Sequence, residues 1–201
     1  MSVALKKRAE RFTYGGYVTW PDDERWELIH GMAYDMSPAP STEHQRVLTK
    51  LLVPFGQFFT DREGEVFCAP FDVRFPENDE ADEDIETVVQ PDIAIVCDPS
   101  KLDSRGCRGV PDIIIEIVSS STAKKDRQDK FFLYEHRGVR EYWIVHPLEH
   151  LVEVFALSDD GKYARPGIFA NDDKLPVRLF HGLEIDLAIV FGIEREQADV
   201  S

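Results

Sequence analysis

The clearest hydrophobic pattern in the chain is the nearly continuous apolar run PDIIIEIVSS at residues 111–120. Such a run predicts a strand that is buried on both faces of a sheet. Side chains alternate along a strand, so Glu116 shares one face with Asp112 and Val118, and the odd-numbered isoleucines share the other. A lone carboxylate is thus predicted inside an apolar strand, and its role needs an explanation.

A helix is predicted over residues 41–59, where apolar positions recur at helical spacing. Thr42 and Gln45 fit a capping box at its start, and Pro54 predicts a kink or an early end. His44 lies on the apolar face of this helix. A single histidine on such a face is more often a hydrogen-bonded core residue than a catalyst, so both interpretations stay open.

Several strands are predicted from alternation and from apolar runs. Residues 24–38 alternate around a His-Gly dipeptide, which predicts a β-hairpin. Residues 65–75 and 88–97 each predict one strand, separated by the acidic segment 77–86 as a solvated hairpin loop. A glycine-containing loop is predicted at residues 105–110.

Residues 119–138 carry helix start and stop signals: a Ser/Thr-rich beginning, His and Arg in the last turn, and Gly138 just past the end. A further strand is predicted at 141–147, so that strand, helix and strand form a crossover between parallel neighbours. Added β-hairpins are predicted from residue 151 onward.

These elements predict an α/β protein with an αβββαβ core, in which helices cover both faces of a mixed sheet. The N-terminal hairpin and the C-terminal strands add to a three-layer α/β/α arrangement. At 201 residues the chain fits a single domain over 1–201, with the core at 42–147.

The charge of the chain argues against nonspecific affinity for nucleic acid. Lys and Arg total 23 against 38 Asp and Glu, a formal net charge of −15, whereas phosphate binding depends on Lys and Arg. No apolar run reaches the roughly 20 residues of a membrane span. The charged N-terminus and three cysteines, Cys68, Cys97 and Cys107, without CxxC spacing fit a reducing cytoplasm and no membrane association.

A second acid is available to share a site with Glu116. Asp112 is four residues away, roughly 13 Å along the strand, which is too far to share one ion. Asp92 is the better candidate, because antiparallel pairing of the two strands would bring opposing residues to about 5 Å. Two close carboxylates repel unless a cation lies between them or one is protonated. Oxygen ligation by both acids, the Ile117 carbonyl and water suits Mg²⁺ or Mn²⁺. Alternatively, Glu116 pairs with Lys130 or an arginine, and Asp92 only caps the strand.

Lys130 lies on the predicted helix that packs against the strand of Glu116, so its ammonium could act on developing phosphoryl charge. Taken alone, however, a lysine at this position more often lies on a solvated face, here with Lys124 and Lys125. Glu27, in the hairpin, could reach the site or pair with an arginine.

These residues, in this order, resemble the Uma2 family of endonucleases, also called DUF820, within the PD-(D/E)XK restriction-endonuclease-like superfamily. The similar stretches are WELIHG, MSPAPSTEHQRV, FDVRF, QPDIAIV, GVPDIIIEIVSSST and DRQDKFFLYEHRGVREYWIV, which span residues 26–145. The resemblance implies a nuclease fold with Asp92 and Glu116 as its acids. Val118 stands where the superfamily motif has lysine, and Lys130 on the following helix is implied as the replacement.

The implied activity is Mg²⁺- or Mn²⁺-dependent hydrolysis of phosphodiester bonds, with DNA or another nucleic acid as a weakly bound, salt-sensitive substrate. The basic side chains expected to offset the acidic surface are Lys124, Lys125, Arg127, Arg105 and Arg108. Two alternatives remain: an inactive nuclease fold that serves as an interaction or regulatory module, and a hydrolase of small phosphodiesters. A homodimer is also predicted, with pairing through an edge strand in the segment 142–157.

Overall fold

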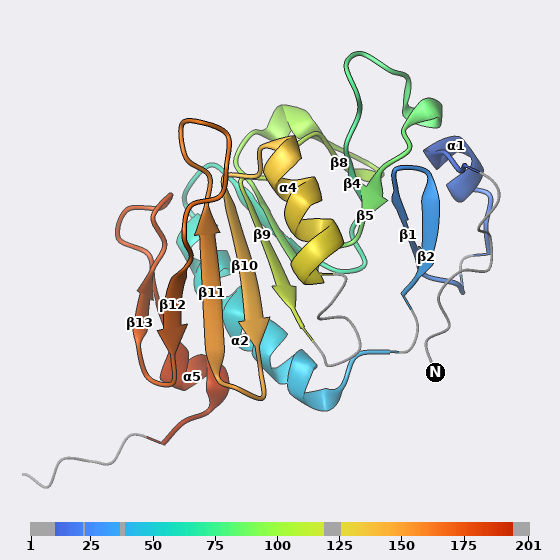
Figure 1. Ribbon diagram of the computed structural model, residues 1–201. Helices are drawn as coiled ribbons and strands as arrows, with labels where there is room; N and C mark the ends of the chain where they lie inside the picture. Colours follow the sequence, from blue (N-terminus) through green and yellow to red (C-terminus); the bar gives the residue numbers. More distant parts are fainter. Residues whose placement is uncertain (1–10, 22, 37–38, 119–125, 195–201) are drawn as a thin grey trace, which may run out of the picture.

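The computed structural model describes residues 11–21, 23–36, 39–118 and 126–194 of the chain. In these residues a six-stranded sheet, here called the central sheet, has the order β12-β11-β10-β9-β6-β3 (Figure 1). Its strands are β3 (Glu65–Cys68), β6 (Ile93–Val96), β9 (Ile113–Ile117), β10 (Glu141–His146), β11 (Leu151–Ala156) and β12 (Gly167–Ala170).

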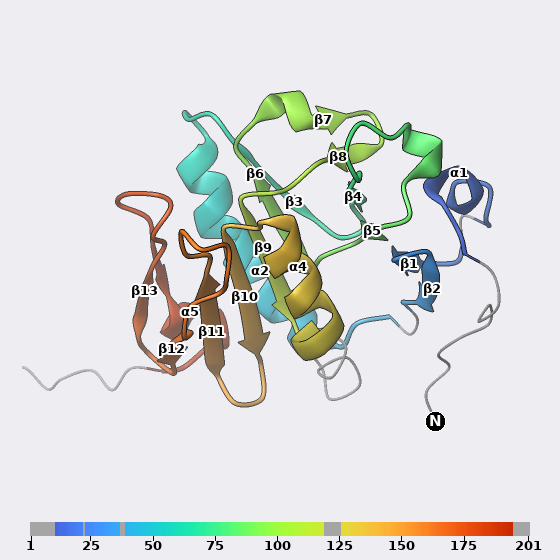
Figure 2. The ribbon, with the colours of Figure 1, turned by 45° about the horizontal axis from the view of Figure 1, so that its top comes forward.

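Two helices flank the central sheet, α2 (Thr42–Phe59) on one face and α4 (Phe131–Arg137) on the other (Figure 2). Alternation along the strands separates two apolar layers. Ile115 packs in one core cluster with Leu51 of α2, whereas Ile114 packs in another with Leu133 of α4. The predicted α/β fold with an αβββαβ core is therefore confirmed, and Glu116 lies on the α4 face.

Strand pairing places the two candidate acids near each other. β6 runs antiparallel to β9, with Ile93 opposite Ile115, so the next pair in register is Asp92 and Glu116. β10 runs parallel to β9, with Ile144 beside Glu116. Both the antiparallel pair and the parallel crossover agree with the sequence-based prediction.

A second sheet, here called the small sheet, has the order β2-β1-β5-β4-β8-β7. Its strands are β1 (Trp26–Ile29), β2 (Met32–Asp35), β4 (Val73–Arg74), β5 (Val88–Val89), β7 (Leu102–Asp103) and β8 (Gly106–Arg108). The predicted hairpin is confirmed, because β1 and β2 are joined by His30 and Gly31 with φ of 51° and 74°. Trp26 and Leu28 pack beside α1 (Tyr14–Tyr17).

Two of the predicted strands are each divided between the two sheets, so predicting them as single strands was wrong. Residues 65–75 form β3 and β4, and residues 88–97 form β5 and β6. The breaks fall near Pro70 and Pro91, which have no backbone N–H for a ladder. The predicted loop at 105–110 also contains β8. Gly106 has φ 121°, and a side chain there would lie 2.3 Å from the Asp72 carbonyl oxygen.

The N-cap of helix α2 lies one residue before the predicted cap, and the helix continues past its proline. Ser41, not Thr42, is the N-cap, and its side chain accepts a hydrogen bond from the His44 N–H. Pro54 lies inside the helix, which extends to Phe59. An early end at Pro54 is therefore wrong, because buried apolar contacts beyond it, such as those of Phe59, favour continued helix.

The helix that follows β9 ends as predicted. A π-helical turn (Asp126–Lys130) precedes α4, and Gly138 caps α4 with φ 82°. The predicted start at residues 119–125 lies outside the described residues. The C-terminal part adds β13 (Lys174–Pro176), β14 (Glu184–Asp186) and α5 (Leu187–Phe191).

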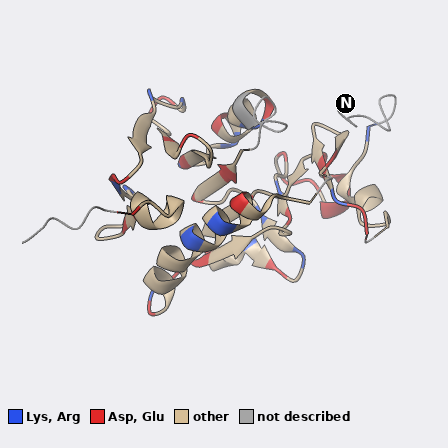
Figure 3. Ribbon diagram, turned by 90° about the horizontal axis from the view of Figure 1, so that it is seen from below, with Lys and Arg blue, Asp and Glu red and all other residues tan. Residues whose placement is uncertain are grey.

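The acidic segment is partly structural rather than only solvated. It joins β4 to β5, as predicted for a hairpin loop, and contains the 3-10 turn Asp82–Asp84. The guanidinium of Arg74 is fully buried between the carboxylates of Asp82 and Asp103. Arg108 also bonds Asp82, at 2.8 Å. Acidic positions occur on strands, helices and loops across the molecule (Figure 3).

The predicted dimer edge is wrong in its location. β10 and β11 are both interior strands, and the edges of the central sheet are β12 and β3. The three cysteines form no disulfide. Among the described residues, no helix is both long and apolar enough to cross a membrane.

Candidate functional site

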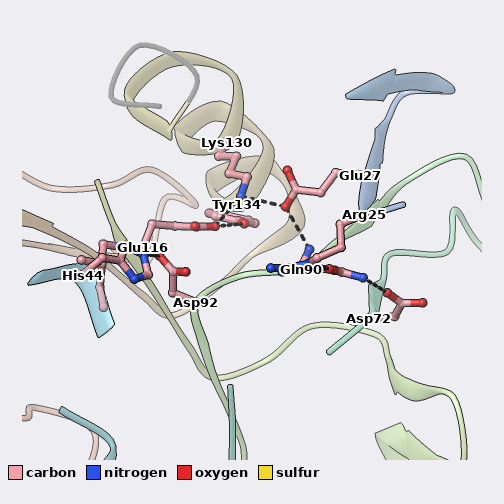
Figure 4. Close-up of polar contacts among 10 residues, drawn as sticks. Arg25, Glu27, His44, Asp72, Gln90, Asp92, Glu116, Lys130 and Tyr134 are labelled. Carbon is pink, nitrogen blue, oxygen red and sulfur yellow. Dashed lines mark hydrogen bonds and ion pairs between the residues drawn. The ribbon is translucent and has the colours of Figure 1, made fainter. Parts of the chain in front are cut away.

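The five side chains proposed from the sequence, Glu27, His44, Asp92, Glu116 and Lys130, form two adjoining groups of contacts (Figure 4). One group centres on the carboxylate of Glu116 and the other on that of Asp92. The groups adjoin because Asp92 bonds the backbone of Ile117, the residue after Glu116. All the predicted site residues are thus brought together.

Glu116 lies inside the protein, with 4% of its surface exposed, and one of its oxygens has two donors. The ammonium of Lys130 lies 2.7 Å from Oε1, and the hydroxyl of Tyr134 donates to the same atom at 2.8 Å. Lys130 and Tyr134 are four residues apart, so they project from the same side of the helix. The crossover helix therefore delivers both donors to the strand that carries the acid.

Lys130 also contacts the small sheet. Its Nζ atom lies 2.8 Å from Oε1 of Glu27, and both side chains are buried. The backbone N–H of Gln90 donates to the same Glu27 oxygen at 2.9 Å. Lys130 therefore bridges two carboxylates from different sheets. The interpretation that Lys130 lies on a solvated face is therefore wrong. The alternative interpretation, an ion pair between Glu116 and Lys130, is present in the structure.

Asp92 precedes β6 and is fixed by two donors on one oxygen. Its Oδ2 atom accepts the N–H of Ile117 at 2.7 Å and lies 3.1 Å from Nε2 of His44. About a fifth of the Asp92 side chain is exposed, so water can reach it. The other ring nitrogen of His44, Nδ1, is buried without a hydrogen-bond partner among the described residues. His44 is therefore a hydrogen-bonded residue that lies beside Asp92.

A polar chain continues from the site into the small sheet. The side-chain oxygen of Gln90 accepts from Arg25, and its amide nitrogen donates to Asp72 at 2.9 Å and to Tyr17 at 3.1 Å. Burial raises the pKa of Asp72, although the hydrogen bonds from Gln90 and Tyr17 oppose that shift. The sequence analysis missed these supporting residues. The QPD sequence before β6 was the available signal for Gln90.

The electrostatics of the site favour a protonated Tyr134 and leave the site with an excess of negative charge. Burial raises the pKa of Tyr134 well above its ordinary value, and the nearby Glu116 and Glu27 raise it further. Tyr134 therefore remains a hydrogen-bond donor. Glu27, Asp92, Glu116 and Lys130 together leave two formal negative charges, which one divalent cation would balance. Val118, on the same face as Glu116, is buried and adds no charge.

The donor atoms suit a hard cation that keeps some of its water. Within the described ranges, no group of three or more His, Cys, Asp and Glu side chains is arranged to hold a metal ion. Two carboxylates completed by water and substrate oxygens are the usual environment of Mg²⁺, whereas structural zinc takes four nitrogen or sulfur ligands. Asp92 and Glu116 therefore fit Mg²⁺ or Mn²⁺ and do not fit zinc.

The sheet order, with one acid just before β6 and another on β9, defines the class of restriction-endonuclease-like folds. The model of the Uma2 family, described as "Putative restriction endonuclease", matches residues 16–188. The chain belongs to the Uma2 family.

The chain is also similar to two other proteins. A crystal structure of a "putative nuclease belonging to DUF820" from Anabaena variabilis superposes with a TM-score of 0.70 at 18% identity, covering 90% of this chain and 98% of the other. That likeness concerns the fold. The "Uncharacterized protein slr1290" of Synechocystis is 26% identical over 159 residues, which are 78% of this chain and 80% of the relative.

Proposed function

We propose that the protein is a divalent-metal-dependent endonuclease that hydrolyses phosphodiester bonds of DNA in the cytoplasm. Asp92 and Glu116 hold Mg²⁺ or Mn²⁺, and the Ile117 carbonyl is a further candidate ligand. Lys130 supplies the positively charged side chain of the site. When bound, the metal ion supplies Lewis acidity toward a phosphoryl group.

The observation that carries this proposal is the hydrogen bond from the Ile117 N–H to Asp92 Oδ2 at 2.7 Å. It fixes the Asp92 carboxylate against the peptide that follows Glu116, at the point where the strand register sets the two acids opposite each other. Two acids in this arrangement repel each other, and a shared dication relieves that repulsion. Two acids on neighbouring strands are also what membership in Uma2 leads one to expect.

Each residue of the site has a separate task. Asp92 uses one oxygen to bind His44 and Ile117, which restricts the direction of its other oxygen. Tyr134 and Lys130 restrict Glu116 in the same way. A buried ammonium close to the acids can stabilise negative charge that develops on a phosphoryl group. His44 uses Nε2 to orient the carboxylate of Asp92.

Affinity for nucleic acid is expected to be weak and salt-sensitive, because the chain carries a net charge of −15. Arg108 was expected to contact phosphate, but it bonds Asp82, and Arg105 lies 3.8 Å from the same carboxylate. These two arginines are therefore withdrawn from the proposed phosphate-binding patch. Lys124 and Lys125 lie outside the described residues and remain candidates.

The test is cleavage of plasmid DNA and of a fluorophore-labelled oligonucleotide in Mg²⁺ or Mn²⁺, with an excess of chelator as the metal-free arm. Wild type should cleave only with metal, and Glu116→Gln should lose at least about 100-fold in rate. Glu141→Gln is the matched control, because Glu141 is also a buried acid but bonds Trp143 on β10. It should retain the wild-type rate.

Three outcomes separate the alternatives. Equal cleavage by wild type and Glu116→Gln would indicate a contaminating nuclease. Cleavage of the oligonucleotide with intact plasmid would favour the small-phosphodiester hydrolase. No cleavage of either substrate would favour the inactive interaction module, which the net charge and Val118 also favour.

A further inference from the structure

Lys130 is shared between two buried carboxylates that come from different sheets. Its ammonium lies 2.8 Å from Glu27 Oε1 and 2.7 Å from Glu116 Oε1. The lysine and Glu27 have 1% and 0% of their surfaces exposed. Buried charges persist only when they are paired, so each partner depends on the ammonium. The lysine thus serves as a counter-ion to both acids.

Glu27 keeps its position without help from Glu116. Its Oε1 atom accepts the N–H of Gln90, and the side chain of Gln90 is in turn bonded by Arg25 and to Asp72 (Figure 4). This chain belongs to the small sheet and the segment before β6. Glu27 is therefore a fixed acceptor for the lysine, whatever else Glu116 binds.

A dication at Glu116 and the Lys130 ammonium would compete for the same carboxylate, since like charges within a few ångströms repel each other. We propose that Glu27 is a positioning residue that holds Lys130 when Glu116 is shared with a divalent cation, and that Lys130 is the resident counter-ion which that cation displaces. The inference rests on the proposed metal site. It assigns Glu27 a role that acts through Lys130, not a contact with substrate.

The proposal predicts opposite effects for the two residues of the pair. Without Glu27, the lysine has one fewer acceptor and stays on Glu116, so the cation binds less well. Without Lys130, the competitor is gone and the cation binds better. The effect of replacing Glu27 on cation affinity should also depend on the presence of the lysine. A change of net charge alone would not produce this dependence.

The test is calorimetric titration with Mn²⁺ alone, on wild type, Glu27→Gln, Lys130→Met and the double variant. Glu27→Gln should weaken Mn²⁺ binding about 10-fold and Lys130→Met should strengthen it about 10-fold, within the range of coupling that contacting groups show. In the Lys130→Met background, Glu27→Gln should change the affinity less than about threefold. Glu141→Gln should match wild type.

Stability measurements guard against misfolding. Melting curves without metal identify variants that unfold, and Lys130→Gln, which retains donors for both acids, replaces Lys130→Met if the latter does not fold. Added Mn²⁺ should raise the melting temperature most in the variant without the lysine, because tighter binding stabilises the native state more.

The inference is overturned if Glu27→Gln weakens binding equally in both backgrounds, or if removal of Lys130 leaves the Mn²⁺ affinity unchanged or lower. Absence of Mn²⁺ binding in wild type and in both Lys130 variants overturns it too. These outcomes are independent of DNA cleavage. If DNA is cleaved but the Mn²⁺ affinities of the variants do not differ as expected, only this inference is refuted. If the affinities differ as expected but no DNA is cleaved, only the nuclease activity is refuted.

Discussion

The N–H of Ile117 donates to the carboxylate of Asp92 at 2.7 Å, which ties the segment before β6 to the end of β9. The same oxygen lies 3.1 Å from the ring of His44, so a backbone group and a side chain from α2 both orient this acid. One acid is thus set in a defined direction beside Glu116 before any ligand binds.

Asp92→Asn should reduce DNA cleavage at least about 100-fold with little loss of stability, because the amide oxygen can still accept from Ile117 but carries no charge. Cleavage rates and melting curves measured on the same preparations check this. Asp112→Asn is the control, since Asp112 also accepts a backbone N–H, from Cys97, and pairs with Arg140 outside the site. A fully active Asp92→Asn would contradict the assignment of this residue.

His44→Ala should reduce cleavage about 10- to 100-fold, the usual effect of removing a side chain that orients a metal ligand. Mn²⁺ affinity should fall with it, because Asp92 then loses one of its two donors. His44→Gln, which retains a donor, should lose less of both. If His44→Ala kept wild-type Mn²⁺ affinity and lost only cleavage, His44 would act on the substrate instead of on Asp92.

Tyr134 should make stability decrease at alkaline pH. Its pKa is raised in the folded protein, so the unfolded chain loses this proton first, at about pH 10. The stabilisation from Tyr134 is therefore complete below about pH 10 and decreases as the pH rises further. Tyr134→Phe should flatten the fall of melting temperature between about pH 9.5 and 11.5, a window set by that ordinary value. An unchanged slope would count against this assignment.

Arg74→Met should destabilise the protein by about 3–5 kcal/mol, because it leaves two carboxylates facing a buried apolar side chain. Arg74 is fully buried, contacts Asp82 and Asp103, and lies over the ring of Tyr14. Arg108→Met, at a partly exposed arginine on the same Asp82, should cost less than about 1 kcal/mol. Urea unfolding measures both, and equal costs would refute the structural role of the acidic segment.

Much of the core was predictable because local signals agreed with the tertiary fold. The isoleucine-rich run predicted β9 and the sheet face on which Glu116 lies. The stop signal at Gly138 matched the end of α4. The division of residues 65–75 and 88–97 was not predictable from alternation, since each segment is apolar on both sides of its break while the chain changes sheets. Proline positions were the only local indication.

The candidate site was predictable in its members but not in its contacts. Strand parity and the expected antiparallel pairing indicated that Asp92 and Glu116 would be neighbours. That Lys130 would also meet Glu27 depends on how the small sheet packs beside α4, which no local pattern encodes. The hydrogen bond from Gln90 to Glu27 likewise comes from a backbone N–H, so the type of residue at position 90 does not encode it.

The lysine that joins Glu27 to Glu116 has a consequence for how such a protein could lose its activity. Because this ammonium pairs with a carboxylate from each sheet, a descendant that abandoned catalysis would still gain stability from it. Asp92 is partly exposed, and an asparagine there keeps an oxygen for the Ile117 N–H, so under the proposed function this change would remove the activity and leave the architecture intact. Among similar chains, the acid before β6 should therefore distinguish working enzymes from retired ones better than the lysine does.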